Sequence, residues 1–128
     1  MEYHSALVEV AAQDLDELNH VNNVRYVEWV QDIAREHWQM KATAEMQNNF
    51  VWMVLTHHIS YRKQAVMGDV IRLKTYVTQS EGVTSTRVVE MYRSSDDALL
   101  VRAKTEWCLI NKNTGKPQRI PQEIKELF

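Results

Sequence analysis

The chain has 128 residues, of which 45% are hydrophobic and 25% charged, and its formal net charge is -2. These values predict one soluble globular domain spanning residues 1–128 and argue against a nucleic-acid-binding protein, which would carry a strongly basic surface. One cysteine, Cys108, rules out an intrachain disulfide, and no segment is typical of a signal peptide or a membrane span, so we expect a cytoplasmic protein.

The first third of the chain predicts a strand followed by a long helix. Residues 5–13 alternate, which predicts a strand with one shared apolar face, formed by Ala6, Val8, Val10 and Ala12. From about Asn23 to Met40 the period becomes helical, and apolar residues from Val24 to Trp38 cover most of the circumference. A helix of this kind is expected to be wrapped by other structure. Asn22 or Asn23 is suited to cap its N-terminus.

The rest of the chain predicts four long strands in succession and a short C-terminal helix. The expected strands are residues 50–62, 70–78, 82–93 and 99–110, and Pro121 opens the final helix. Residues 50–62 begin with apolar side chains on both faces, as expected of a central strand. Short turns between successive strands favour antiparallel pairing, so we expect an α+β domain in which a sheet wraps one helix.

A cluster of polar residues, DLDELNHVNN at 14–23, directly precedes the helix. Because aspartate favours turns, Asp14 and Asp16 could simply form a solvated loop. Alternatively, one carboxylate could activate water or attack a carbonyl, while the N–H groups and dipole of the helix stabilise the oxyanion. His20 could cap or pack the loop, or it could orient the acid or a substrate carbonyl.

Other reactive side chains favour structural interpretations. His57 and His58 point to opposite faces of a strand and cannot hold one metal ion together. We expect His57, on the face of Leu55 and Ile59, to be a hydrogen-bonded core histidine. Cys108 has no obvious partner for a nucleophilic role. No metal-ligand spacing and no glycine-rich phosphate loop is present, so we expect neither a metal nor a cofactor.

The polar cluster and the helix start resemble a known family. DLDELNHVNNVRYVEW, at 14–29, resembles the opening motif of hotdog-fold thioesterases, both the 4-hydroxybenzoyl-CoA thioesterase-like branch and the plant-type acyl-ACP thioesterases. HHISYRKQAVMGDVIRLKTYV and WCLINKNTGKPQRIPQEI extend the resemblance over nearly the whole chain. The resemblance implies a hotdog domain, with about five antiparallel strands around one long helix. It also implies a hydrolase that cleaves acyl-CoA or acyl-ACP to a free acid and a thiol.

The resemblance also implies roles for individual residues. Asp16 would be the nucleophile or general base, the backbone N–H near Asn23 would polarise the thioester carbonyl, and His20 matches a family histidine implicated in catalysis. Residues implied to shape the loop or line the substrate site are Asn22, Asn23, Tyr26 and Trp29, with Tyr61 and Arg62 as further substrate-binding candidates. Hotdog domains work as dimers, so a homodimer or homotetramer is expected, and a second chain would complete the site.

Two positions depart from the family pattern. Asn19 stands where many relatives have glycine, and Leu18 stands where the plant-type acyl-ACP enzymes carry an asparagine, which removes one of their proposed catalytic groups. Two other functions remain open. A hotdog hydratase would use an Asp-x4-His pair, which neither acid forms with His20. A non-catalytic hotdog domain would bind acyl-CoA without releasing the thiol. The sequence leaves open the acyl chain and the choice between CoA and carrier protein.

Overall fold

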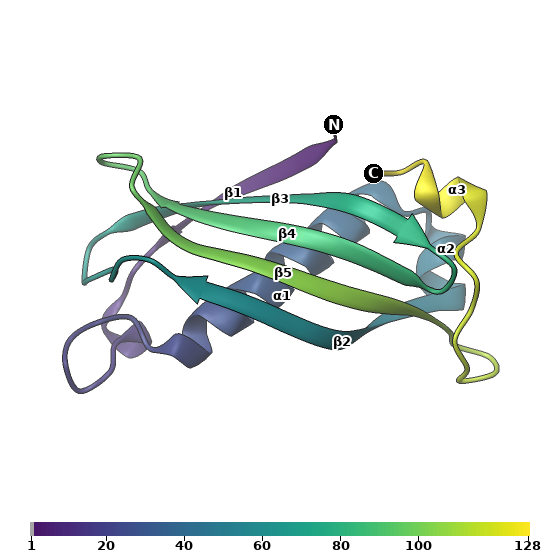
Figure 1. Cartoon of the computed structure of the whole chain (residues 1–128), viewed down its shortest axis with the longest axis horizontal. Helices are drawn as coiled ribbons and strands as arrows, with labels where there is room; N and C mark the ends of the chain where they lie inside the picture. The colour runs from purple at the N-terminus through teal and green to yellow at the C-terminus, as the bar shows by residue number, and fades with distance from the viewer. Residues whose placement is uncertain (1) are drawn as a thin grey trace.

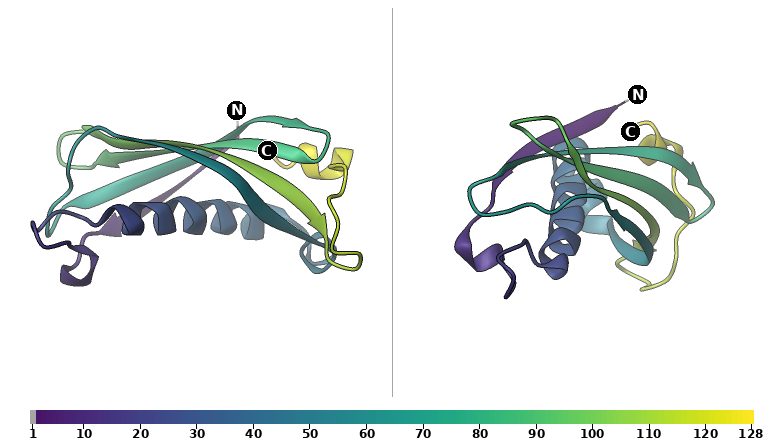
Figure 2. Two further views of the ribbon diagram at one scale, coloured as in Figure 1. Left: turned by 60° about the horizontal axis from the view of Figure 1, so that its bottom comes forward. Right: turned by 60° about the vertical axis from the view of Figure 1, so that its left-hand side comes forward.

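A computed structural model describes residues 2–128 and shows one antiparallel five-stranded sheet curved over a long helix (Figures 1 and 2). The strand order is β1-β3-β4-β5-β2. The strands are β1 (Tyr3–Glu9), β2 (Phe50–Tyr61), β3 (Val70–Glu81), β4 (Thr84–Arg93) and β5 (Leu99–Asn111), and the helices are η1 (Ala12–Asp14), α1 (Asn23–Lys41), α2 (Ala44–Asn49) and α3 (Gln122–Lys125). This arrangement confirms the predicted α+β hotdog fold. In residues 2–128, no helix is long and apolar enough to cross a bilayer.

The position of β2 corrects the sequence prediction. Strands β3, β4 and β5 pair as consecutive hairpins, but β2 pairs with β5 and forms an edge of the sheet. The prediction of a central strand at 50–62 was therefore wrong. Apolar residues occupy both faces of β2. Those on one face point toward the core, and those on the other face are 45–49% exposed in the single chain: Val51, Met53 and Leu55.

A bulge in β2 changes which residues share a face. The register shifts between Val54 and Thr56, so Leu55 faces outward while His57 and Ile59 face inward. The expectation that Leu55 lies on the face of His57 was therefore wrong. His57 is hydrogen-bonded as predicted, with its Nδ1 2.7 Å from Oγ1 of Thr105, and burial lowers its pKa.

The first strand is shorter than predicted. It ends at Glu9, and Ala12 lies in the 3-10 turn η1 instead of on the strand. The turn forms because the backbone N–H of Ala11 donates to the Asp14 carboxylate at 2.9 Å, which closes the chain on itself. Ala6 and Val8 do pack inward, as expected.

Helix α1 has one buried face. Asn22 caps it, because its side chain accepts a hydrogen bond from the backbone N–H of Val24 at 2.9 Å. The buried residues are Tyr26, Trp29, Val30, Ile33, Ala34, His37 and Trp38. Val24 is 63% exposed, so the expectation of a helix covered over most of its circumference was wrong. The sheet of a single chain covers only one side of α1, as Figure 2 shows.

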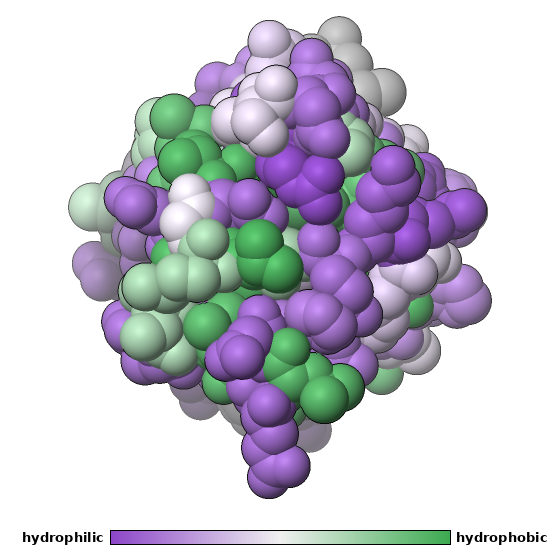
Figure 3. Space-filling model, turned by 90° about the vertical axis from the view of Figure 1, so that its left-hand side faces the viewer, coloured by the Kyte–Doolittle hydropathy of each residue, from purple (hydrophilic) through white to green (hydrophobic). Residues whose placement is uncertain are grey.

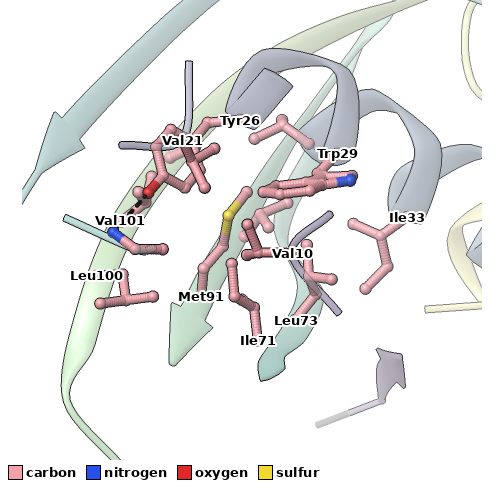
Figure 4. Packing of buried hydrophobic residues seen from close by; sticks show 14 residues of the cluster. Val10, Val21, Tyr26, Trp29, Ile33, Ile71, Leu73, Met91, Leu100 and Val101 are labelled. Carbon is pink, nitrogen blue, oxygen red and sulfur yellow. Dashed lines mark hydrogen bonds between the residues drawn. The ribbon is translucent and has the colours of Figure 1, made fainter. Parts of the chain in front are cut away.

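The core consists of two apolar clusters. The larger packs the first half of α1, through Tyr26, Trp29 and Ile33, against inward-facing residues of β3, β4 and β5 (Figure 4). The smaller joins Trp38 to β5 and α3. Several buried polar residues belong to neither cluster: His37, Thr75, Ser85, Arg87 and Thr105. His37 precedes Trp38 on α1, so the apolar core is interrupted along the helix.

Candidate active site

The polar cluster forms a compact loop at the N-terminal end of α1. Its ends are joined by a hydrogen bond from the Asp16 backbone N–H to the His20 carbonyl at 2.7 Å. The backbone N–H of Val21 donates to Ala65, so the loop lies against the segment that follows β2. Figure 3 shows hydrophobic side chains gathered at this end of the molecule, where Leu18 and Met67 are exposed.

The two acids of the motif have different environments. Asp14 is only 4% exposed and forms an ion pair with Nε of Arg25 at 2.9 Å. Interpreting it as part of a solvated loop was wrong, because it links η1 to the first turn of α1. Asp16 is exposed on the same loop. The structure therefore separates a structural acid from one that solvent can reach.

The loop holds the Asp16 carboxylate by one oxygen. Its Oδ1 accepts hydrogen bonds from the backbone N–H groups of Leu18 at 2.9 Å and His20 at 3.1 Å. Among residues 2–128, Oδ2 has no hydrogen-bond partner. Asn19 has φ 62°, a left-handed conformation that asparagine tolerates, so the loop closes without the glycine expected there.

The start of α1 supplies a free backbone donor next to the cap residue Asn22. Within the described chain, the backbone N–H of Asn23 makes no hydrogen bond, and it points along the positive end of the helix dipole. Asp16 and the cap residue Asn22 line the same shallow depression. A carboxylate with one free oxygen and an unpaired N–H at a helix start can together activate a nucleophile and stabilise an oxyanion.

The other candidate residues surround this end of α1. Tyr26 is buried, its hydroxyl accepts from the Ala65 backbone N–H at 3.2 Å, and its ring lies 5.8 Å from the ring of Tyr61. Tyr61 and Arg62 are exposed. The side chain of His20 is half-buried, and the Asp16 carboxylate contacts its backbone, not its ring.

A separate cavity of about 500 Å³ lies farther along the helix. Its residues on α1 run from Gln31 to Gln39, so it starts about 12 Å beyond Asn23 at 1.5 Å per residue. The remaining lining comes from α2, β2, β4, β5, the turn after β5 and the C-terminal residue: Gln47, Phe50, Val51, Trp52, Val54, Ser85, Arg87, Trp107, Lys112 and Phe128. Within a single chain, the candidate acid therefore lies apart from this cavity.

Two buried polar residues escaped the sequence analysis. Nη1 of Arg87 on β4 donates to Nδ1 of His37 at 2.9 Å and to Oγ1 of Thr75 at 3.0 Å. Periodicity offered a signal for both. Arg87 alternates with the inward residues Val89 and Met91, and His37 follows Ile33 by one helical turn.

Further reactive groups are confined to structural positions. Cys108 is buried, and its Sγ lies 3.7 Å from the carbonyl oxygen of Leu109. The part of the chain that the structure describes holds no group of three or more histidine, cysteine or acidic side chains placed to bind a metal.

Comparison with known proteins gives matches over most of the chain. The family model of the Thioesterase-like superfamily matches residues 10–128. A palmitoyl-acyl carrier protein thioesterase of Arabidopsis thaliana is 31% identical over 86 residues, which cover 66% of this chain and 21% of the relative. The long-chain acyl-CoA thioesterase FadM of Escherichia coli is 22% identical over 121 residues, covering 93% of this chain and 92% of the relative.

Among solved structures, the chain resembles an aspartate-to-asparagine variant of 4-hydroxybenzoyl-CoA thioesterase in complex with 4-hydroxybenzoyl-CoA. The TM-score is 0.86 at 15% identity, with 98% of this chain and 97% of the other covered. This likeness supports the fold. The chain spans about a fifth of the length of the first curated relatives that it matches.

Proposed function

The chain belongs to the Thioesterase-like superfamily, and from this membership we propose that it hydrolyses acyl thioesters of CoA or of acyl carrier protein. The names of its relatives, acyl-carrier-protein and acyl-CoA thioesterases, support this activity. The observation that carries the proposal is the Asp16 carboxylate, held by Oδ1 and free at Oδ2, beside the start of α1.

In the proposed reaction, Asp16 acts through Oδ2 by one of two routes. As general base it takes a proton from water, and the hydroxide adds to the thioester carbon. As nucleophile, the Asp16 carboxylate attacks the thioester carbon and forms a mixed anhydride with the acyl group, and water then cleaves this anhydride. In both routes the Asn23 N–H stabilises the oxyanion, and the thiolate leaves and takes up a proton. Thiolates leave readily, so the site needs no strong general acid.

A second chain would bring the acid and the cavity together. The end of β2, at Tyr61, lies beside the first turn of α1, and its start, at Val51, lines the cavity. If two β2 edges pair antiparallel about a two-fold axis, the end of one strand lies beside the start of the other. The Asp16 loop of one protomer then faces the cavity of its partner. We therefore propose a homodimer, alone or within a homotetramer, that acts in the cytoplasm.

The test is thiol release from a panel of acyl-CoA and acyl-ACP substrates. Asp16→Asn should abolish release while the variant remains folded, because the amide can neither accept the proton nor attack. Glu123→Gln, at an exposed carboxylate on α3, is the matched control and should retain full activity. An active Asp16→Asn variant would refute the assigned role.

The same panel separates the alternatives. Tight acyl-CoA binding without thiol release would instead indicate a non-catalytic acyl-binding domain. A hydratase would change the absorbance of an enoyl-CoA, but it would need an acid–histidine pair. The contact of Asp16 with the backbone of His20 does not support such a pair.

A further inference from the structure

The cavity beside α1 is lined by cations without any acid. Its fifteen lining residues include Arg35, Arg87 and Lys112 but no aspartate or glutamate, although the whole chain has more acids than bases. Arg87 is buried, so its positive charge lies deep in the cavity, whereas Lys112 is exposed and Arg35 is exposed and paired with Asp32 at 3.4 Å. This charge distribution favours an anionic ligand.

Arg87 is a buried cation that lacks an anionic partner. It is 6% exposed and forms no ion pair within residues 2–128. Both of its side-chain hydrogen bonds use Nη1, and both partners, His37 and Thr75, are neutral acceptors. Burial alone lowers the pKa of Arg87 to about 10, so it stays charged at neutral pH. A buried charge without a counter-ion is costly for the fold, and a carboxylate ligand would offset that cost.

The walls around Arg87 suit an apolar chain with a polar end. Five aromatic side chains line the cavity: Trp38, Phe50, Trp52, Trp107 and Phe128. The indole N–H of Trp107 is buried without a hydrogen-bond partner in the described chain, which is an unusual loss for a buried donor. Trp107 and Arg87 therefore offer two unused donor groups to a ligand oxygen, while the aromatic rings contact its methylene groups.

We propose that this cavity binds the far end of an acyl group that terminates in a carboxylate, so that the preferred substrates are thioesters of dicarboxylic acids. The inference rests on the proposed thioesterase function. The acyl chain would run from the thioester, held at the partner's loop, into the cavity. Its distal carboxylate would then accept hydrogen bonds from Arg87 and from the Trp107 indole. The same chemistry would also let the carboxylate of a free fatty acid enter the cavity head first.

The first experiment compares three CoA thioesters of equal chain length, with a distal carboxylate, hydroxyl or methyl group. For the wild type we expect kcat/KM to be highest with the carboxylate, by roughly tenfold or more over the methyl-ended chain. Arg87→Met, of similar length but uncharged, should reverse this preference. Arg102→Met, at an exposed arginine on the outer face of β5, is the matched control and should keep it. Equal loss of activity on all three substrates would indicate a purely structural Arg87.

Trp107→Phe provides a second variant, which removes the indole N–H and keeps an aromatic ring. It should lower kcat/KM for the carboxylate-ended substrate more than for the methyl-ended one, because it removes the indole donor and keeps an aromatic wall. A wild-type enzyme that prefers the methyl-ended chain, or variants that discriminate like the wild type, would overturn the inference and leave the proposed thioesterase function intact.

Binding of free acids separates the two sources of carboxylate, and it separates failure of the carboxylate site from failure of the hydrolase proposal. Three tryptophans line the cavity, so intrinsic fluorescence reports its occupancy. If no thioester is cleaved but a dicarboxylic acid binds in an Arg87-dependent way, the carboxylate site is supported and the hydrolase proposal fails. If a monocarboxylic fatty acid binds as tightly as the dicarboxylic acid and the three thioesters are cleaved equally, the site binds free acids and the inference about the substrate is wrong.

Discussion

Protonation of His37 should destabilise the fold in acid. His37 lies on the buried face of α1, its ring is stacked 5.5 Å from His4, and its Nδ1 accepts a hydrogen bond from Arg87. Burial, together with the positive charge of Arg87, lowers the pKa of His37 from 6.5 to about 4. His4 and Lys41 act in the same direction, and the Glu2 carboxylate opposes them. The folded protein therefore holds His37 in its neutral form.

The magnitude follows from the difference between the two states. Between pH 6.5 and about 4, His37 is protonated in the unfolded chain and neutral in the folded chain, so the free energy of unfolding falls as the pH falls. Each unit of pKa is worth about 1.4 kcal/mol, and the shift from 6.5 to about 4 corresponds to about 3 kcal/mol lost between these pH values. This loss is a large fraction of the stability of an ordinary domain.

Urea denaturation of the wild type and of His37→Gln, at several pH values from 7 to 4, measures this contribution. Glutamine can accept the Arg87 hydrogen bond but does not titrate in this range. The wild type should therefore lose about 3 kcal/mol more than the variant on acidification. His58→Gln, at an exposed histidine on β2, controls for the loss of a histidine and should follow the wild type. Parallel pH profiles for the wild type and His37→Gln would refute the reasoning.

Two further predictions concern the loop and the sheet edge. Asp14→Ala should lower the free energy of unfolding by about 2 to 3 kcal/mol, because it removes a buried carboxylate from the partly exposed Arg25. Glu28, which also pairs with Arg25, is exposed, so Glu28→Ala should lower the free energy of unfolding by less than about 0.5 kcal/mol. Equal losses for Asp14→Ala and Glu28→Ala on chemical denaturation would contradict the structural role of Asp14. Met53→Lys should dissociate the protein into monomers in analytical ultracentrifugation, since a charge on an edge strand opposes pairing. Tyr3→Lys on the β1 edge should not, and a Met53→Lys dimer would exclude β2 as the interface.

The sequence was most informative where one periodicity held over much of an element. Strand β5 alternates from Val101 to Glu106, where the structure places Val101 and Ala103 inward and Arg102 outward, and Leu100, buried beside Val101, departs from the alternation. The start of α1 was equally predictable, because Asn22 is a good cap directly before a helical pattern. These features depend on neighbours close in the sequence.

Features that depend on distant partners were not predictable. Asp14 and Asp16 are alike in sequence, and only the fold brings Arg25 to one of them. Apolar residues on both faces of β2 suggested a central strand. No local signal distinguishes apolar residues that the chain buries from apolar residues that stay exposed in the single chain. The bulge at Leu55 likewise reversed a face that strict alternation had assigned. The cavity around Arg87 combines residues from seven segments, so no single stretch of sequence indicated it.

The pairing of β2 with β5 also sets the order in which the chain can fold on the ribosome. Phe50 pairs with Asn111 and Tyr61 with Val101, so the two strands are separated by 40 to 61 residues. During synthesis β2 therefore leaves the exit tunnel long before β5, its neighbour in the sheet of a single chain. Until β5 emerges, both backbone edges of β2 are unpaired, and Val51 and Met53 are open to other nascent chains. Folding of this domain therefore cannot be completed before β5 has been synthesised and has paired with β2.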